Sequence, residues 1–171
     1  MPYPVFLAGM VPTADELTAL QPRVAYKTAA TDRTSTVTPA DDPDLVMELE
    51  AGLWLVRFVL RLGATANSDG VRTEWTTPSG SSGVRAVIGP NSTGITSRFD
   101  TTLQIPMQSL TTDIEYRLEG AFSTSNPIAI EECLLTVGTT GDVALAWAQY
   151  TSHADASRVG AGSYMRAERW E

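Results

Sequence analysis

The chain has 171 residues, of which 12 are basic and 20 acidic, and it contains one histidine and one cysteine. One cysteine cannot form an internal disulfide bond, and one histidine excludes most histidine-based metal sites and leaves little room for a catalytic triad. A formal net charge of −8 disfavours binding to nucleic acid or to an anionic membrane, because both need a basic protein surface. The length fits one domain with an added arm.

The first 22 residues are predicted to form an extended arm followed by a short helix. Three prolines among residues 1–12 exclude a helix there and disfavour a central strand. Thr13 and Glu16 have the spacing of a capping box, and the helix is placed at about residues 14–20. The apolar side chains of this segment must pack on their own domain or on a neighbouring subunit. The candidate partner-interface residues are Tyr3, Val5, Phe6, Leu7, Met10, Val11, Leu17 and Leu20.

No segment has the basic start and the apolar length of a secretion signal or of a membrane-spanning helix, so the sequence predicts a soluble protein without a secretion signal.

From residue 23 onward the pattern indicates β structure. The chain contains 22 Thr and 13 Ser, which favour strands and turns respectively. A polar strand is expected around residues 34–38, a turn at residues 40–44 and a loop at residues 152–162. The best candidate for a central strand has an apolar inner face, with Arg57 and Arg61 on the other side. That inner face consists of Trp54, Val56, Phe58, Leu60 and Leu62.

These features predict an all-β fold, a β-sandwich or jelly roll of about nine or ten strands, with an N-terminal extended arm and one short helix. A closed barrel is the structural alternative. We expect residues 1–22 to form the anchoring arm and helix and residues 23–171 to form the sandwich domain.

Side chains that could take part in catalysis or in ligand binding are few and scattered along the sequence. His153 lies between Ser152 and Asp155, but without the strand–turn–helix scaffold of a nucleophile it is interpreted as a loop residue. Glu131 and Glu132 are adjacent, so on a strand they point to opposite sides. The inward-pointing carboxylate then needs an arginine partner across the sheet, unless it lies at an exposed edge.

The remaining candidates have structural interpretations. The Asp41, Asp42 and Asp44 cluster is interrupted by Pro43, which favours a turn over a calcium loop. Cys133 lies in an apolar run and is expected to be a small buried residue. Three tryptophans lie in strand patterns and are expected in the core rather than as sugar-stacking platforms, whereas Trp170 is assigned no role. We therefore predict no enzymatic activity, no metal and no cofactor.

Three stretches of the sequence resemble a known family. The first is Val5-Phe6-Leu7-Ala8-Gly9-Met10-Val11-Pro12-Thr13-Ala14-Asp15-Glu16-Leu17. The second is Lys27–Thr36, continuing to Asp41–Leu45, and the third is Leu145–Ser152 with Ala161–Ala167. In this order they are similar to small structural proteins of tailed bacteriophages, especially those of actinobacteria. Residues 63–127 match nothing specific.

The resemblance implies a virion protein with a β-sandwich head, located on the outer surface and assembled in the host cytoplasm. It implies other virion proteins, capsid or tail subunits, as partners, and a homo-oligomer, a trimer by analogy. A capsid decoration or minor capsid protein anchored by the arm is the first hypothesis. A minor tail or fibre protein that binds a host receptor or glycan is the alternative.

Overall fold

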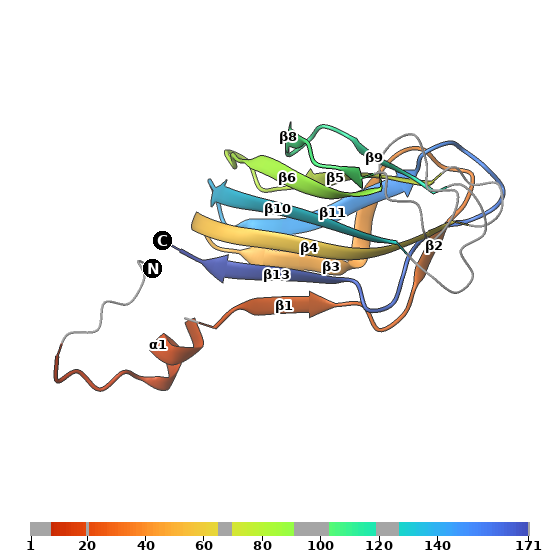
Figure 1. Cartoon of the computed structure of the whole chain (residues 1–171). Coiled ribbons are helices and arrows are strands. Elements are labelled where there is room, and N and C mark those ends of the chain that lie inside the picture. Colours follow the sequence, from red (N-terminus) through yellow and green to blue (C-terminus); the bar gives the residue numbers. More distant parts are fainter. Residues whose placement is uncertain (1–7, 20, 65–69, 91–102, 119–126, 171) are drawn as a thin grey trace.

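The computed structural model describes residues 8–19, 21–64, 70–90, 103–118 and 127–170. Within these residues the chain forms one short helix and thirteen strands, more strands than the nine or ten predicted (Figure 1). The elements are α1 (Ala14–Ala19), β1 (Arg23–Tyr26), β2 (Thr31–Arg33), β3 (Ala40–Leu49), β4 (Gly52–Ala64), β5 (Gly70–Thr76), β6 (Val84–Pro90), β7 (Leu103–Gln104), β8 (Met107–Ser109), β9 (Ile114–Arg117), β10 (Ile128–Val137), β11 (Gly141–Gln149), β12 (Ser157–Val159) and β13 (Tyr164–Arg169).

The strands form two antiparallel sheets, which confirms the predicted all-β sandwich. The larger sheet has the order β1-β13-β4-β10-β6-β7, with β8 also paired to β6, and with β12 paired to β4 and β2. The smaller sheet has the order β3-β11-β5-β9. β4 and β10, the two central strands of the larger sheet, pair over ten successive residues, from Ile128 opposite Arg61 to Val137 opposite Gly52.

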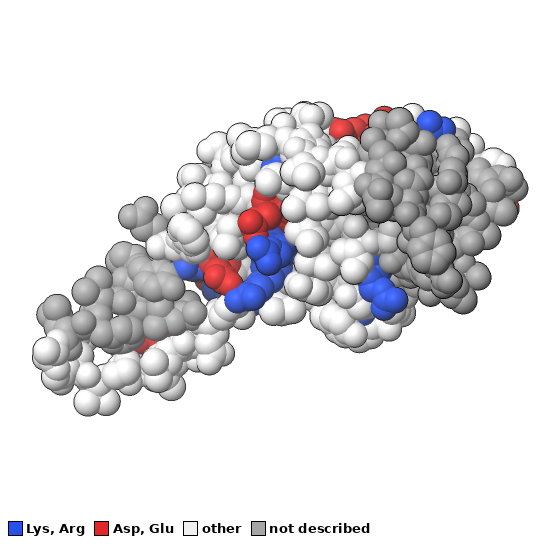
Figure 2. All heavy atoms as spheres, viewed as in Figure 1, with Lys and Arg blue, Asp and Glu red and all other residues white. Residues whose placement is uncertain are grey.

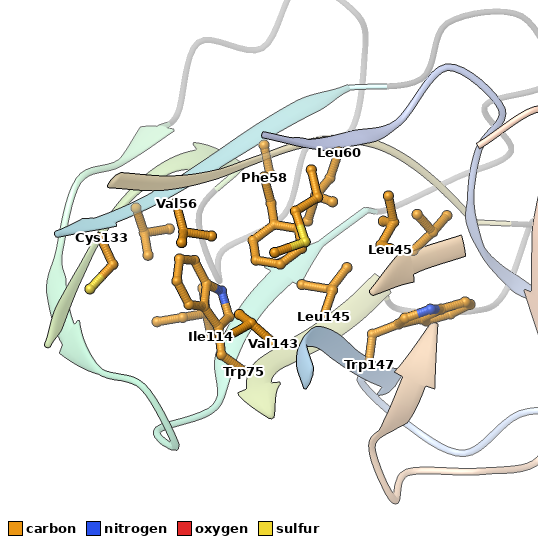
Figure 3. Packing of buried hydrophobic residues seen from close by; sticks show 14 of the residues in the cluster. Leu45, Val56, Phe58, Leu60, Trp75, Ile114, Cys133, Val143, Leu145 and Trp147 are labelled. Atoms are coloured by element: carbon orange, nitrogen blue, oxygen red, sulfur yellow. The ribbon is translucent and has the colours of Figure 1, made fainter. Parts of the chain in front are cut away.

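The core lies between the two sheets (Figure 3). The inner face predicted for β4 is correct: all five of its apolar side chains are at most 2% exposed, whereas Arg57 and Arg61 are exposed. Phe58 from the larger sheet meets Trp75 from the smaller one edge to face, with ring centroids 4.8 Å apart. Trp147 is also fully buried, so the three strand tryptophans are core residues, as predicted.

Three local predictions are wrong. The expected polar strand at residues 34–38 is absent, because the backbone bends at Ser35, which has φ of 53°. The expected turn at residues 40–44 is the start of β3, where Asp42 is fully buried. The expected loop at residues 152–162 contains β12, a three-residue strand that pairs with β2 on one side and β4 on the other.

Candidate interaction surfaces

The apolar side chains in the described part of the arm are exposed to solvent. The capping box is formed as predicted: the Thr13 backbone N–H donates to Glu16 Oε2 at 2.7 Å, and the Glu16 N–H donates to Thr13 Oγ1 at 3.3 Å. The backbone hydrogen bond from Thr13 lowers the pKa of Glu16. The cap starts α1 at Ala14, and in Figure 1 α1 projects away from the two sheets.

Three of the predicted interface residues lie in this part of the chain. Val11 is 89% exposed, and Met10 and Leu17 are each 48% exposed. The other five, Tyr3, Val5, Phe6, Leu7 and Leu20, lie outside the described residues. The described arm therefore presents apolar side chains that the sandwich core does not absorb.

The outward side of the larger sheet carries a second apolar surface, which the sequence analysis missed. Along β10 the inward residues are buried, yet the outward residues Ile128 and Leu134 are 57% and 45% exposed. We call this surface the apolar face. Its exposed and half-exposed apolar side chains are Val24 and Tyr26 on β1, Tyr164 on β13, Leu55 and Val59 on β4, Ile128, Ile130 and Leu134 on β10, Val84 and Ile88 on β6, and Leu103, Ile105 and Met107 along the β7–β8 edge.

The strand register arranges these side chains in rows across the sheet. One row is apolar throughout: Tyr26 lies opposite Tyr164, Tyr164 opposite Val59, Val59 opposite Ile130, and Ile130 opposite Ile88. Cross-strand neighbours of this kind are about 4.5–5.5 Å apart and form a continuous surface.

The next row is charged at its centre. Arg166 lies opposite Arg57, and Arg57 lies opposite Glu132. Arg57 Nε donates to Glu132 Oε2 at 2.6 Å, and Arg166 is paired with Glu168 on its own strand. Beyond this row, Leu55 lies opposite Leu134. Figure 2 shows the result from outside: a compact group of charged side chains with uncharged surface on either side.

The outward side of the smaller sheet is different. Its strand β11 presents the exposed Asp142 near its start and then three small side chains, Ala144, Ala146 and Ala148, which are buried. The partners of these alanines across the sheet on β5 are polar: Thr76, Glu74 and Arg72, in that order. Arg72 pairs in turn with Asp113 at 3.2 Å, and further out Arg117 lies over the Tyr150 ring at 5.3 Å. Long polar side chains thus cover this sheet, and no broad apolar surface is left on its described part.

Between the sheets, Glu131 is the centre of a buried polar network. Thr73 Oγ1 and Tyr116 OH donate to its Oε1 at 2.5 and 2.8 Å, and Trp75 Nε1 and Arg85 Nη1 donate to its Oε2 at 2.6 and 2.8 Å. Glu131 and Arg85 come from the larger sheet and the other three from the smaller one. Burial raises the pKa of the Tyr116 hydroxyl well above its usual value, and the adjacent Glu131 carboxylate adds to the effect. The arginine partner predicted for a buried glutamate is therefore present, and the network joins the two sheets.

A second buried ion pair holds the start of β3. Lys27 Nζ donates to Asp42 Oδ1 at 2.7 Å and to Asp44 Oδ2 at 2.8 Å, and Trp147 Nε1 donates to Asp42 Oδ2 at 2.9 Å. Lys27 and Asp42 are both fully buried. This pairing explains why the aspartate cluster forms a strand instead of the predicted turn. Buried charges require partners, and here Lys27 provides one.

The structure does not bring His153, Cys133 and Trp170 together into one site. His153 Nδ1 accepts a hydrogen bond from the Asp155 backbone N–H at 2.9 Å, on a half-exposed loop. Cys133 is buried as predicted, and burial raises the pKa of its thiol to about 11, which disfavours the reactive thiolate. Trp170 is 54% exposed, and its backbone N–H donates to Leu53 O at 2.8 Å.

The described part of the chain holds neither a candidate metal-binding group nor a helix that could span a membrane. Its His, Cys, Asp and Glu side chains form no group of three or more that could hold a metal ion. Its helix is too short and too polar to cross a membrane.

Comparison with known proteins assigns the chain to no family. No protein-family model matches the chain, and no curated protein matches it. Among solved structures, it is similar to the "Structure of infectious bursal disease virus Gx strain", with 14% sequence identity and a TM-score of 0.18. The alignment covers all of this chain, which spans 42% of the length of the other. A likeness of this size carries no argument, so the fold assignment rests on the two sheets themselves.

Proposed function

We propose that this protein is a non-enzymatic structural protein of a tailed-phage virion, most specifically a capsid decoration or minor capsid protein anchored by its N-terminal arm. The observation that carries the proposal is the exposure of apolar arm side chains, with Val11 89% exposed and Leu17 48% exposed. Apolar side chains outside a completed core are expected where a segment packs on another subunit.

The interior of the sandwich supports this proposal. The buried acids and bases are consumed in pairing with each other: Glu131 with Arg85, and Asp42 with Lys27. Buried charges that pair in this way hold a fold in one arrangement, although Arg85 Nε has no hydrogen-bond partner among the described residues. These ion pairs stabilise the interior of the sandwich.

Two features of the sequence give the finer assignment. The stretches at both ends of the chain resemble small structural proteins of tailed phages. The net charge of −8 favours a position outside the shell, because a negatively charged protein is repelled by packaged DNA.

Incorporation into particles tests the proposal. We expect full-length protein carrying Val11→Asp and Leu17→Asp to be lost from purified virions while its thermal unfolding midpoint is unchanged, because both side chains are exposed. A chain lacking residues 1–12 should behave in the same way. The matched control is Val37→Asp, which changes another exposed valine, 40% exposed and outside the arm, and should leave occupancy at the wild-type level. Full occupancy by the arm variants would refute anchoring by the arm.

A further inference from the structure

We infer that the apolar face of the larger sheet is a self-association surface, and that two copies of this chain pack there face to face about a two-fold axis. The inference concerns a second copy of the chain and not the virion, so it stands or falls independently of the proposed function. Three observations carry it: the size of the surface, the pattern of its charges and the contrast with the opposite sheet.

The surface is large enough for a stable dimer. The apolar side chains that are 44–74% exposed on this face are Val24, Tyr26, Val84, Ile88, Leu103, Ile105, Met107, Ile128 and Leu134. These side chains extend across the larger sheet from β1 to the β7–β8 edge, and an exposed apolar surface larger than the roughly 300–600 Å² found on a typical monomer marks an interaction site. One partner in a standard interface contributes about 800 Å².

The charges at the centre of the face, Arg57 and Glu132, are complementary to themselves. Arg61, also on the outward side of β4, lies opposite Ile128 and donates a hydrogen bond to Ala161 O at 3.2 Å.

The charged row contains Arg166, Arg57 and Glu132. Glu168, the ion-pair partner of Arg166, lies in the next row, opposite Leu55. β4 and β10 are the central strands, with β13 and β1 beyond β4, and with β6 and then β7 or β8 beyond β10. A two-fold axis parallel to the strands, between β4 and β10, places β4 of one copy over β10 of the other.

This axis brings like rows together. Arg57 of one copy then faces Glu132 of the other, Val59 faces Ile130, and Leu55 faces Leu134, because each of these pairs is already in register across β4 and β10. The Arg57–Glu132 pairs of the two copies become a group of four alternating charges, with Val59 and Ile130 on one side and Leu55 and Leu134 on the other. A two-fold interface requires such self-complementarity, and sheets packed face to face lie about 10 Å apart with their strands within about 30°.

Native mass spectrometry and light scattering of the purified full-length chain test the inference. At about 50 µM, well above the micromolar end of the affinities of such interfaces, we expect a dimer. Ile88→Asp and Leu134→Asp should each weaken the dimer about 100-fold or more, because a carboxylate would be buried against apolar side chains. Both positions are about half exposed in the monomer, so circular dichroism and thermal unfolding should show an intact fold. Val37→Asp is the matched control and should remain dimeric.

Exchanging the charges of Arg57 and Glu132 tests whether the apolar face binds a second copy of this chain. Arg57→Glu alone should dissociate the dimer, because it places carboxylates against Glu132 in both copies. The double variant Arg57→Glu with Glu132→Arg should restore the dimer, since the row is again complementary to itself. A wild-type monomer or trimer at this concentration would overturn the inference. So would a dimer that survives Ile88→Asp and Leu134→Asp, or a charge exchange that fails to restore association.

Discussion

The two sheets of the sandwich share one core but differ on their outward sides. On the smaller sheet, β5 alternates between buried apolar or hydrogen-bonded residues and polar outward ones, so Arg72, Glu74 and Thr76 complete the surface. On the larger sheet, β10 runs Ile-Ala-Ile-Glu-Glu-Cys-Leu-Leu-Thr-Val, with apolar residues on both sides of the strand. Antiparallel sheets with one solvated face show clean alternation, and strands buried on both faces are apolar throughout. The outward side chains of the smaller sheet therefore suit contact with solvent, whereas those of the larger sheet suit packing against a second copy of the chain.

This difference leads to a rule for substitutions. Changes on the inner side of β10 should alter folding stability, and changes on its outer side should alter association. Neighbouring residues on β10 give matched pairs of variants for this rule. They are best made in the Ile88→Asp background, so that self-association does not contribute to the measured stability.

The adjacent glutamates give the largest contrast. Glu131→Ala should lower the free energy of unfolding by about 3–5 kcal/mol, because it leaves the Arg85 guanidinium buried without its carboxylate. Glu132→Ala removes only an exposed ion pair with Arg57 and should cost less than about 1 kcal/mol. Urea unfolding monitored by tryptophan fluorescence measures both. Equal effects would show that Glu131 is not the centre of the interior network.

The adjacent leucines repeat the contrast with one apolar substitution. Leu135 is fully buried and Leu134 is 45% exposed. Leu135→Ala should destabilise the fold by about 2–5 kcal/mol through the cavity that it leaves, whereas Leu134→Ala should cost about 1 kcal/mol or less. Chemical denaturation of the two variants is the measurement. A large loss at Leu134 would mean that the outward side is already packed within one chain.

Thiol reactivity compares the two sides without any change in stability. Burial raises the pKa of Cys133 to about 11, so at pH 8 its thiolate fraction is lower than that of an exposed cysteine by more than roughly 100-fold. Thr136→Cys places a second thiol at an exposed outward position of β10. With a chromogenic disulfide reagent, we expect this second thiol to react at once and Cys133 to react only on unfolding. Rapid modification of Cys133 in the native protein would contradict the closed inner side.

The smallest effect is a pH dependence at the sheet edge. The hydrogen bond from Arg23 lowers the pKa of Glu50, and the Arg169 charge adds to this. A lowered folded-state pKa stabilises the protein above the unfolded-state pKa, and this contribution is lost as the pH falls through the folded-state value. Because the pair is about half exposed, we expect less than about 1 kcal/mol, lost between about pH 5 and pH 3. The difference in unfolding free energy between wild type and Glu50→Gln should shrink over that range, and a constant difference would exclude this ion pair as the cause.

Much of this architecture can be predicted from local pattern. The inner face of β4 and the capping box at Thr13 each follow from side chains within a few residues of one another. The need for an arginine beside a buried glutamate also follows, because an unpaired buried charge is too costly. That the partner is Arg85, 46 residues away in sequence, does not follow from any local signal.

The failures have physical causes of the same kind. Asp42 lies in a strand because Lys27 and Trp147 neutralise and hold it, and both are distant in sequence. β12 exists because β4 and β2 flank it, and its Ser-Arg-Val composition alone does not specify a strand. The apolar face does not follow from the inner pattern of the strands, because that pattern specifies only which side chains pack in the core. The signal that could have found it is the excess of apolar residues at the outward positions of β4 and β10.

We propose that the protein is a structural component on the outside of a virion. Immunogold electron microscopy of intact purified particles, with antibody against the sandwich, tests it most directly. We expect label distributed over the outer surface of the heads. Label confined to tails would favour the tail or fibre assignment over decoration, and particles without any label would contradict the claim.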